Sequence, residues 1–551
     1  MNPAIPETPP TAVPADDETA PAAVTTSAAP STAGMTTKVV KGSLWTLAGQ
    51  VAPLAVSLVT TPFVIRMLGA ESYGVLILVG LIPTYLGFAD FGMSLASTKF
   101  ASEAYAEGDF EKEARIVRTA ALIALCSSVP IAAVLFAFSP AIISLFNVPE
   151  HLHAEASLAL KFAAVTFVIN FLNGIFNTPQ LTRLRMDLNT LVTAGFRIAG
   201  LIATPFAVYF GGIVGGVAVL MIASILSLVG HLTVSGRLTR ELFALTFAWP
   251  WAGRLLKFGG GMLLAIIAAA LQGNIDKLVI ARLMEPSMLA YYSVAFTFAL
   301  TLTLFSQAIT QSLIPAFSQL LSPDRREQLR VLFLRALRFS SILIVPVIAL
   351  LTISAKPFLT IWAGKDFGEY STRPLLILSV GLYFQAISYI FSGLLVADGR
   401  TDLIAKLFWA QLVPFAAAIA FFTSAFGIVG AAASWTLCTM VHDLAMFVLV
   451  RRKFGFSLGG WFRVVKFAGP IAVMLALPLV AAAALEPGLP WVVLWGAGFV
   501  AVYSLATWRL MISTEERSQF IALFGSTLIG RLARKGSRSF RAWARFGGAR
   551  S

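Results

Sequence analysis

Gly212-Ile213-Val214-Gly215 recurs in this chain as Gly427-Ile428-Val429-Gly430, a separation of 215 residues (427 minus 212). Matching landmarks held in register over such a distance indicate two copies of one structural unit. We therefore predict a duplicated fold. Three further pairs keep this spacing to within one residue: Phe176 with Phe391, Asp187 with Asp402, and Arg66 with Arg282.

The composition indicates an integral membrane protein. Of the 551 residues, 58% are hydrophobic and only 12% are charged, and the mean hydropathy is +0.82. This leaves too little polar surface to cover a soluble globule of that size. The two cysteines, Cys126 and Cys438, both lie in apolar runs, where an unpaired thiol usually packs as a small hydrophobic group. We therefore expect neither a disulfide nor a metal site.

Fourteen apolar runs are long enough to cross a hydrocarbon layer, which takes about 20 residues of helix each. We predict these spans at residues 43–65, 73–97, 116–138, 156–178, 188–209, 212–234, 256–281, 288–313, 331–354, 374–396, 401–424, 428–450, 465–485 and 489–511.

The distribution of Lys and Arg sets the orientation of these spans. Positive residues crowd the loops and helix ends that follow the even-numbered spans, and such residues remain on the cytoplasmic side. Both termini are therefore predicted to be cytoplasmic. The loops after the odd-numbered spans hold few: Arg66, Arg282, Lys356, Lys365 and Arg373.

The duplication also has a predicted geometry. A shift of 215 residues carries spans one to six onto spans seven to twelve, an even number, so both copies keep the same orientation. Two parallel copies are related by an axis along the membrane normal, with a cleft between two lobes at mid-membrane. The predicted fold is an all-α integral membrane protein of about 14 transmembrane helices. Its two parallel six-helix lobes occupy residues 38–240 and 250–455, and two appended helices occupy residues 460–511.

The two ends of the chain differ in composition. Residues 1–37 are rich in Ala, Pro and Thr, contain no Lys or Arg, and are predicted to be a disordered cytoplasmic tail. Residues 512–551 are basic, with apolar residues at near-helical spacing. This pattern is typical of an amphipathic helix on an anionic membrane surface. The net charge of +14 therefore indicates contact with lipid rather than with nucleic acid.

The sequence contains no pattern that predicts an enzyme. It lacks a Gly-x-x-x-x-Gly-Lys-Ser/Thr phosphate loop, a His-Glu-x-x-His motif, a Gly-x-Ser-x-Gly motif and paired cysteines at zinc spacing. No catalytic residue or cofactor is expected, and transport is the better class.

Arg197 is the most informative polar residue, because a charge near the bilayer centre costs about 2.5–3.5 kcal/mol even on lenient scales. It lies well inside the predicted span 188–209. One interpretation is a cavity cation whose planar fork holds a phosphate or carboxylate. The other is an Arg bonded to a helix carbonyl or to the membrane interface.

Four acidic or titratable residues in the spans are candidates for ion coupling. Asp90 is either a cation site or a group that bonds the start of a neighbouring helix. His442 and Asp443 are candidates for proton coupling, although adjacent residues point about 100° apart on a helix. Asp276 lies next to Lys277, and for the same reason we expect no direct pair and predict that both reach the interface.

Uncharged polar residues in the spans complete the predicted site. They serve either to bind sugar hydroxyls or to join helices, which is the commoner use. Gln411 falls near the position that the repeat makes equivalent to Arg197, so we expect it across the cleft from that cation. The members assigned to the cavity are Asn173, Gln272, Gln307 and Gln411.

Several segments resemble the flippases of polysaccharide biosynthesis, in the superfamily that also holds multidrug and toxin extrusion transporters and the lipid II flippase. The opening Gly42-Ser43-Leu44-Trp45 and the later Phe88-Ala89-Asp90-Phe91-Gly92 are similar to that family. The start of the second copy, Asn274-Ile275-Asp276-Lys277, resembles it as well. Further similar segments are residues 65–74, 278–282, 290–295 and 397–400.

The resemblance implies outward movement of an oligosaccharide carried on polyprenyl pyrophosphate. It also implies alternating access between two six-helix lobes around a cationic cavity, in a bacterial inner membrane. The partners it implies are membrane lipids and the polymerase and export proteins of polysaccharide synthesis. Lipid II flippases carry basic residues within their first helix, whereas the first span here offers only Gln50 before Arg66. A lipid II substrate is therefore less expected. The remaining alternatives are a cation-coupled multidrug exporter and a membrane polysaccharide polymerase.

Overall fold

The computed structural model describes residues 32–456, 489–511 and 517, except for residues 245, 248 and 302. All elements of this described part are helices. In the first half of the chain they are α1 (Thr32–Tyr85), η1 (Gly87–Asp90), α2 (Met93–Ala106), α3 (Phe110–Ala137), α4 (Ser139–Ser144), α5 (Glu150–Phe176), α6 (Thr178–Thr182), α7 (Met186–Leu238) and η2 (Arg240–Phe243). In the second half they are α8 (Trp249–Leu283), α9 (Pro286–Thr301), α10 (Thr303–Gln319), η3 (Pro323–Arg325), α11 (Arg326–Ala363), α12 (Lys365–Tyr370), α13 (Thr372–Ala397), α14 (Thr401–Phe454), α16 (Leu489–Ala506) and η4 (Thr507–Met511).

Eight segments of the described chain are long and apolar enough to cross a membrane; they contain α1, α3, α5, α7, α11, α13, α14 and α16. Three of these helices are 53 or 54 residues long, about 80 Å at 1.5 Å per residue, whereas the hydrocarbon core is about 30 Å thick. Each is divided into two arms where glycine leaves the helical conformation: α1 at Gly69, α7 at Gly211–Gly212, and α14 at Gly427.

The duplicated motif has the same backbone structure in both copies. Gly212 has φ 54° and ψ −141°, and Gly427 has φ 62° and ψ −146°. Three residues on, a Cβ at Gly215 would lie 2.1 Å from the carbonyl oxygen of Ala207, and one at Gly430 would lie 1.9 Å from that of Phe422. Only glycine fits a positive φ followed by so close an approach without strain. The predicted structural duplication is therefore visible at atomic detail in this motif.

A second matched feature lies at the start of α7 and of α14. The Arg185 guanidinium donates a hydrogen bond of 3.0 Å to Asp187, and Arg400 donates one of 2.8 Å to Asp402. The first pair lies 215 residues before the second in the chain. The repeat thus extends from the start to the break of each long helix.

The span predicted at 73–97 is interrupted. It stops at Tyr85 and resumes as α2 at Met93, because Phe91 and Gly92 both have positive φ (49° and 68°). The span predicted at 288–313 is helical on both sides of residue 302, from Pro286 to Thr301 and from Thr303 to Gln319.

The connections between helices define two ends of the molecule. We call the end with the connections 107–109, 183–185, 239–248, 320–325 and 398–400 the basic end. We call the opposite end, with the connections 145–149, 284–285 and 364 and the breaks of α1, α7 and α14, the far end. At the far end Asn147 N–H donates to the carbonyl of Ala281, Gly427 approaches Met284, and Gly212 approaches Glu155. The breaks of both repeats therefore lie at the same end.

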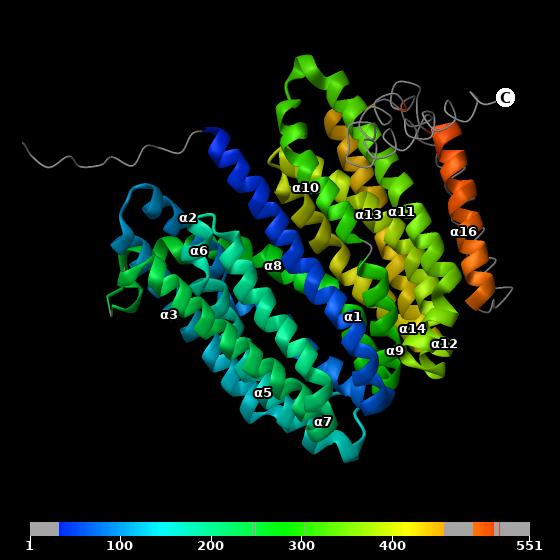
Figure 1. The fold of residues 1–551 in the computed structure, drawn as a ribbon, viewed down its shortest axis with the longest axis horizontal. Helices are drawn as coiled ribbons and strands as arrows, with labels where there is room; N and C mark the ends of the chain where they lie inside the picture. Colours follow the sequence, from blue (N-terminus) through cyan, green and yellow to red (C-terminus); the bar gives the residue numbers. More distant parts are fainter. Residues whose placement is uncertain are drawn as a thin grey trace, which may run out of the picture.

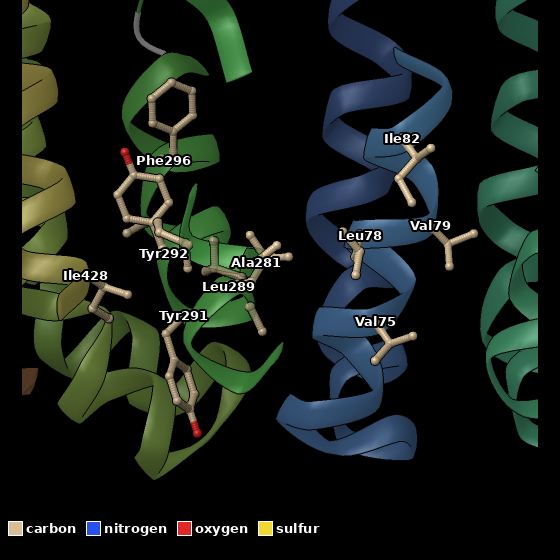
Figure 2. Close-up of a cluster of buried hydrophobic side chains, with 14 of the residues drawn as sticks. Val75, Leu78, Val79, Ile82, Ala281, Leu289, Tyr291, Tyr292, Phe296 and Ile428 are labelled. Atoms are coloured by element: carbon tan, nitrogen blue, oxygen red, sulfur yellow. The ribbon is translucent and has the colours of Figure 1, made fainter. Parts of the chain in front are cut away.

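One apolar cluster fills the far end and contains residues from both halves. Figure 2 shows α1, which carries Val75 and Leu78, beside α9, which carries Leu289 and Tyr292. Val79 points to the opposite side of α1. The closest approach is at Gly74, where a Cβ would lie 1.8 Å from the carbonyl oxygen of Pro286. Burial of this cluster away from water or headgroups stabilises the contact between the halves.

Two separate clusters lie at the basic end. One contains Met93, Ile116 and Leu255, and the other contains Phe317, Phe333 and Phe391. Figure 1 shows the corresponding helices spread apart at the end where α1 begins and brought together around α1, α7 and α9 at the other. The halves are therefore joined at the far end and diverge toward the basic end.

Helix α8 belongs to both halves. Its first turns pack in the first-half cluster through Leu255 and Phe258, and a Cβ at Gly259 would lie 1.9 Å from the carbonyl oxygen of Phe91. Its later turns pack against α14 and α9. The start of the predicted second lobe, residue 250, thus lies against the first half.

The ends of the chain differ in part from the prediction. Helix α1 begins at Thr32, so the last residues of the tail predicted at 1–37 are helical, because no proline interrupts the run into the first span. Helix α16 packs on α11, where the Tyr503 hydroxyl donates to the carbonyl of Ile342. The helix predicted at 465–485 and the basic tail at 512–551, apart from residue 517, lie outside the described residues.

Candidate functional site

Arg197 lies in the first arm of α7, about 16 Å along the helix axis from its start at 1.5 Å per residue. Thr190, seven residues earlier, lies on the same face of the helix as Arg197. The Thr190 hydroxyl donates to the carbonyl of Trp45 on α1. The Arg197 side chain is exposed, and no hydrogen bond or ion pair joins it to another described residue. It is a cation deep in a membrane segment, on the face turned toward α1.

Gln411 and His442 lie on the two arms of α14 and contact each other. The Gln411 Oε1 atom is 2.8 Å from His442 Nδ1, and the His442 ring stacks on Phe408 with centroids 5.1 Å apart. Gln411 is thus hydrogen-bonded to the other arm of α14. The repeat had predicted it across the cleft from Arg197. This hydrogen bond requires the Nδ1 proton on His442.

Asp443, the next residue, takes no part in the Gln411–His442 hydrogen bond. Its side chain is buried, and among the described residues its Oδ1 atom has no hydrogen-bond partner. A joint role of His442 and Asp443 in proton coupling remains a prediction. Asp443 therefore has a carboxylate oxygen available to an ion.

Asp276 and Lys277 form a buried ion pair, contrary to the prediction. Their exposed fractions are 1% and 8%, and Lys277 Nζ lies 3.5 Å from Asp276 Oδ1. The prediction was wrong because it considered only the directions of neighbouring side chains on one helix. Packing of α9 across α8 buries both groups, and the flexible Lys stem bends back to the carboxylate.

Asp90 caps the turn that interrupts the second predicted span. Its Oδ1 accepts from Gly92 N–H at 2.8 Å, and its Oδ2 accepts from the Ser94 hydroxyl at 3.0 Å. These are the contacts of a helix cap, the second of the two interpretations from the sequence. Its role in ion coupling remains a prediction.

The uncharged candidates lie in different places. Asn173 Nδ2 donates to the carbonyl of Ser224 at 3.1 Å, and Gln307 Nε2 donates to the Tyr389 hydroxyl at 2.8 Å. Both bonds join helices within one half. Gln272 has a buried Oε1 atom with no partner among the described residues. The structure therefore does not gather the four predicted cavity residues into one constellation.

Two residues that close the far end had no predicted role there. The Arg66 guanidinium on α1 donates to the carbonyl of Ile361 on α11 at 2.7 Å, and Trp362 Nε1 donates to the carbonyl of Leu58 at 2.8 Å. The two bonds are reciprocal, since each helix supplies one donor and one acceptor. Arg66 stood out in the sequence as a repeated landmark, but nothing there indicated its partner.

The described part of the chain contains no group of three or more His, Cys, Asp or Glu side chains placed to hold a metal ion. The described features are those of a membrane transporter: long apolar helices in duplicate, halves joined at one end, and isolated intramembrane charges.

Residues 63–372 match the family of polysaccharide biosynthesis proteins, and the chain belongs to that family. A relative from Shigella flexneri named "Putative O-antigen transporter" is 24% identical over 418 residues, which cover 74% of this chain and 96% of the relative. The "Lipopolysaccharide biosynthesis protein WzxC" of Escherichia coli is 21% identical over 428 residues, covering 76% and 82%. The chain is thus a multi-pass membrane transporter and not an enzyme.

The fold is also that of a solved transporter. A structure of the lipid II flippase MurJ, in an inward closed conformation, superposes with a TM-score of 0.67 over 85% of this chain and 99% of that chain. The sequence identity is 15%, so the likeness concerns the fold alone.

Proposed function

We propose that this protein moves a polyprenyl-pyrophosphate-linked oligosaccharide from the cytoplasmic to the outer leaflet, for surface or extracellular polysaccharide. The observation that carries the proposal is the arrangement of the apolar clusters. One cluster joins the halves at the far end, and separate clusters leave them apart toward the basic end. Closure at one end only is what alternating access requires. Family membership and the relatives supply the class of substrate.

The proposed topology has fourteen crossings, in two parallel lobes of six helices and one appended pair. Support for parallel lobes comes from the breaks at Gly212 and Gly427, which have the same conformation and lie at the same end. The excess of Lys and Arg at the basic end supports a cytoplasmic position for that end. The basic end then faces the cytoplasm of a bacterial cell, and both termini lie there.

Arg197 is the proposed contact for the pyrophosphate. It is a membrane-embedded cation with no partner among the described residues, and a guanidinium matches phosphate oxygens in a two-pronged geometry. Outward movement of each negative charge from a negative interior gains about 2.3 kcal/mol per 100 mV. The positive charge of Arg197 disfavours the alternative function, export of cationic drugs.

Ion coupling is the second part of the proposal. Asp443 fits a coupling role best because its Oδ1 atom is unsatisfied among the described residues. The carboxylate of Asp90 acts as a cap, whereas that of Asp276 accepts from Tyr292 and has the Lys277 ammonium beside it as a counter-ion. Polysaccharide polymerase and export proteins are proposed neighbours only, on the strength of the substrate class.

Deletion of the gene tests the function. Lipid-linked repeat units should accumulate on the inner leaflet, and surface polysaccharide should fall by at least tenfold. Arg197→Ala should restore no transport at normal protein amount, whereas Arg197→Lys should restore part of it, since the charge remains without the fork. Arg185→Gln, at the exposed N-cap position of the same helix, is the matched control and should restore transport fully.

Two results would count against the proposal. Normal surface polysaccharide in the deletion strain would remove the flippase function. Full transport by Arg197→Ala would remove that residue from the site. A changed drug-susceptibility profile with normal polysaccharide would favour the multidrug exporter.

A further inference from the structure

The buried pair of Asp276 and Lys277 has poor geometry for a structural ion pair. The Lys277 ammonium lies 3.5 Å from Asp276 Oδ1 and 3.5 Å from Asn274 Oδ1. It also lies over the Phe296 ring, with the centroid 3.7 Å away. Asp276 Oδ1 accepts no hydrogen bond from a described residue. An ion pair compensates for the loss of water only with short bonds that satisfy the remaining donors and acceptors.

The other deeply buried pair, Glu113 with Arg183, has such bonds. Arg183 donates to both oxygens of Glu113, at 2.6 and 3.0 Å, and to the carbonyl of Leu238 at 3.2 Å. Glu113 also accepts from the Thr182 hydroxyl at 2.9 Å. This pair fastens α3 to the ends of α6 and α7. The Lys277 ammonium, in contrast, is held loosely.

The loosely held pair lies where the two halves meet. Asp276 Oδ2 accepts from the Tyr292 hydroxyl at 2.6 Å, and both Tyr292 and Phe296 belong to the apolar cluster of the far end. Two residues before Asp276, the carbonyl of Asn274 accepts from the hydroxyl of Tyr85, which comes from α1. Separation of the halves at the far end would therefore break the Tyr85 contact and uncover the neighbourhood of Lys277.

We propose that Lys277 is a second phosphate-binding residue, used when the far end opens, and that Asp276 is its counter-ion while the far end is closed. When the far end opens, water solvates the Asp276 carboxylate. The Lys277 ammonium then leaves this carboxylate and binds an oxygen of the substrate's pyrophosphate. Tyr292 keeps Asp276 in place through its hydrogen bond. This inference rests on the proposed function and adds a second substrate-binding residue to it. Its ligand chemistry is a pyrophosphate, whether borne by a lipid or free.

The first test is transport in the deletion strain with the double variant Asp276→Asn/Lys277→Gln, which removes both charges and keeps similar shapes. We expect at least a tenfold lower translocation rate per molecule of protein, at an unchanged amount of protein. Lys277→Arg should keep at least a third of the rate, because the cation remains. The exposed pair changed in the same way, Arg185→Gln/Asp187→Asn, is the control and should transport within twofold of the wild type.

The second test is binding to the purified full chain in which Gly74→Ala disfavours closure of the far end. Undecaprenyl pyrophosphate should bind at least tenfold more weakly when Asp276→Asn/Lys277→Gln is added. Inorganic pyrophosphate losing affinity in the same proportion would identify the phosphates themselves as the ligand. A loss confined to the lipid form would assign the site to the lipid-linked headgroup.

The outcomes separate this inference from the proposed function. If the wild-type gene fails to restore polysaccharide, the function itself fails. If it restores polysaccharide and the double variant transports at the wild-type rate per molecule, the pair is structural only and the inference is overturned. Unchanged binding of both pyrophosphate probes would also overturn it.

Discussion

The far end and the basic end differ in what joins the two halves of the chain. At the far end the halves share one apolar cluster and two reciprocal hydrogen bonds, from Arg66 and from Trp362. At the basic end α8 docks on the turn at Phe91, and the clusters on either side are separate. An extended interface resists opening more than contact through a single helix does. The described conformation is therefore closed at the far end.

Both ends nevertheless use the same device at their closest point. Gly74 meets the carbonyl of Pro286 at the far end, and Gly259 meets that of Phe91 at the basic end. In each case a missing Cβ lets backbone from one half approach backbone from the other. The comparison between the ends can thus be tested with the same substitution at each.

Gly74→Ala should have the largest effect. Its Cβ would lie 1.8 Å from the oxygen of Pro286. So deep an overlap falls in the upper part of the about 1–3 kcal/mol that overpacking costs, roughly a ten- to 150-fold shift in population. A single cysteine at Ile65, 2% exposed in the far-end cluster, should then react with a thiol reagent at least tenfold faster. Cys126 and Cys438 are first replaced by Ala. An unchanged rate would contradict the far-end interface.

Gly259→Ala should have a smaller effect, although its Cβ would lie 1.9 Å from the oxygen of Phe91. A single helix makes the contact at that end, so α8 can shift away from the turn and relieve part of the overlap. A cysteine at Leu255, fully buried beside that turn, should react about threefold to tenfold faster. The same cysteine with Gly74→Ala should not change. A larger effect here than at Gly74 would reverse the comparison.

Trp362→Phe should weaken the far end by a single hydrogen bond. The ring contacts with Phe298 and Phe358 are kept, while the bond to Leu58 is lost, at a cost of about 1 kcal/mol. Labelling at Ile65 should rise by roughly fivefold. Labelling faster than in Gly74→Ala would mean that the ring, and not the interface, holds this end.

Asp187→Asn should have the smallest effect. Its pair with Arg185 is exposed at the basic end, and such pairs contribute about 0–1 kcal/mol. Thermal stability and labelling at Leu255 should both stay within error of the wild type. A large loss of stability would show that the basic end depends on ion pairs more than the comparison allows.

The sequence predicted features that one segment determines by itself. Repeated glycines required by a local conformation, such as Gly212 and Gly427, mark the duplicated breaks, and apolar runs mark the helices. It did not predict contacts that depend on a second segment. Nothing near Glu113 indicates Arg183, seventy residues on, and nothing near Asp276 indicates that α9 buries it. The interruption at Phe91 escaped prediction because its apolar run continues across the turn.

Helix α8 has a mechanical consequence. The helix packs against the first half at its beginning and against the second half along its later turns. A rigid helix cannot move with both halves when they rotate relative to each other. Either it bends or it slides, and Gly259-Gly260-Gly261 is where its stiffness is lowest. Under the proposed function, tilting at one end is thereby transmitted to the other, so that the two ends do not open at the same time.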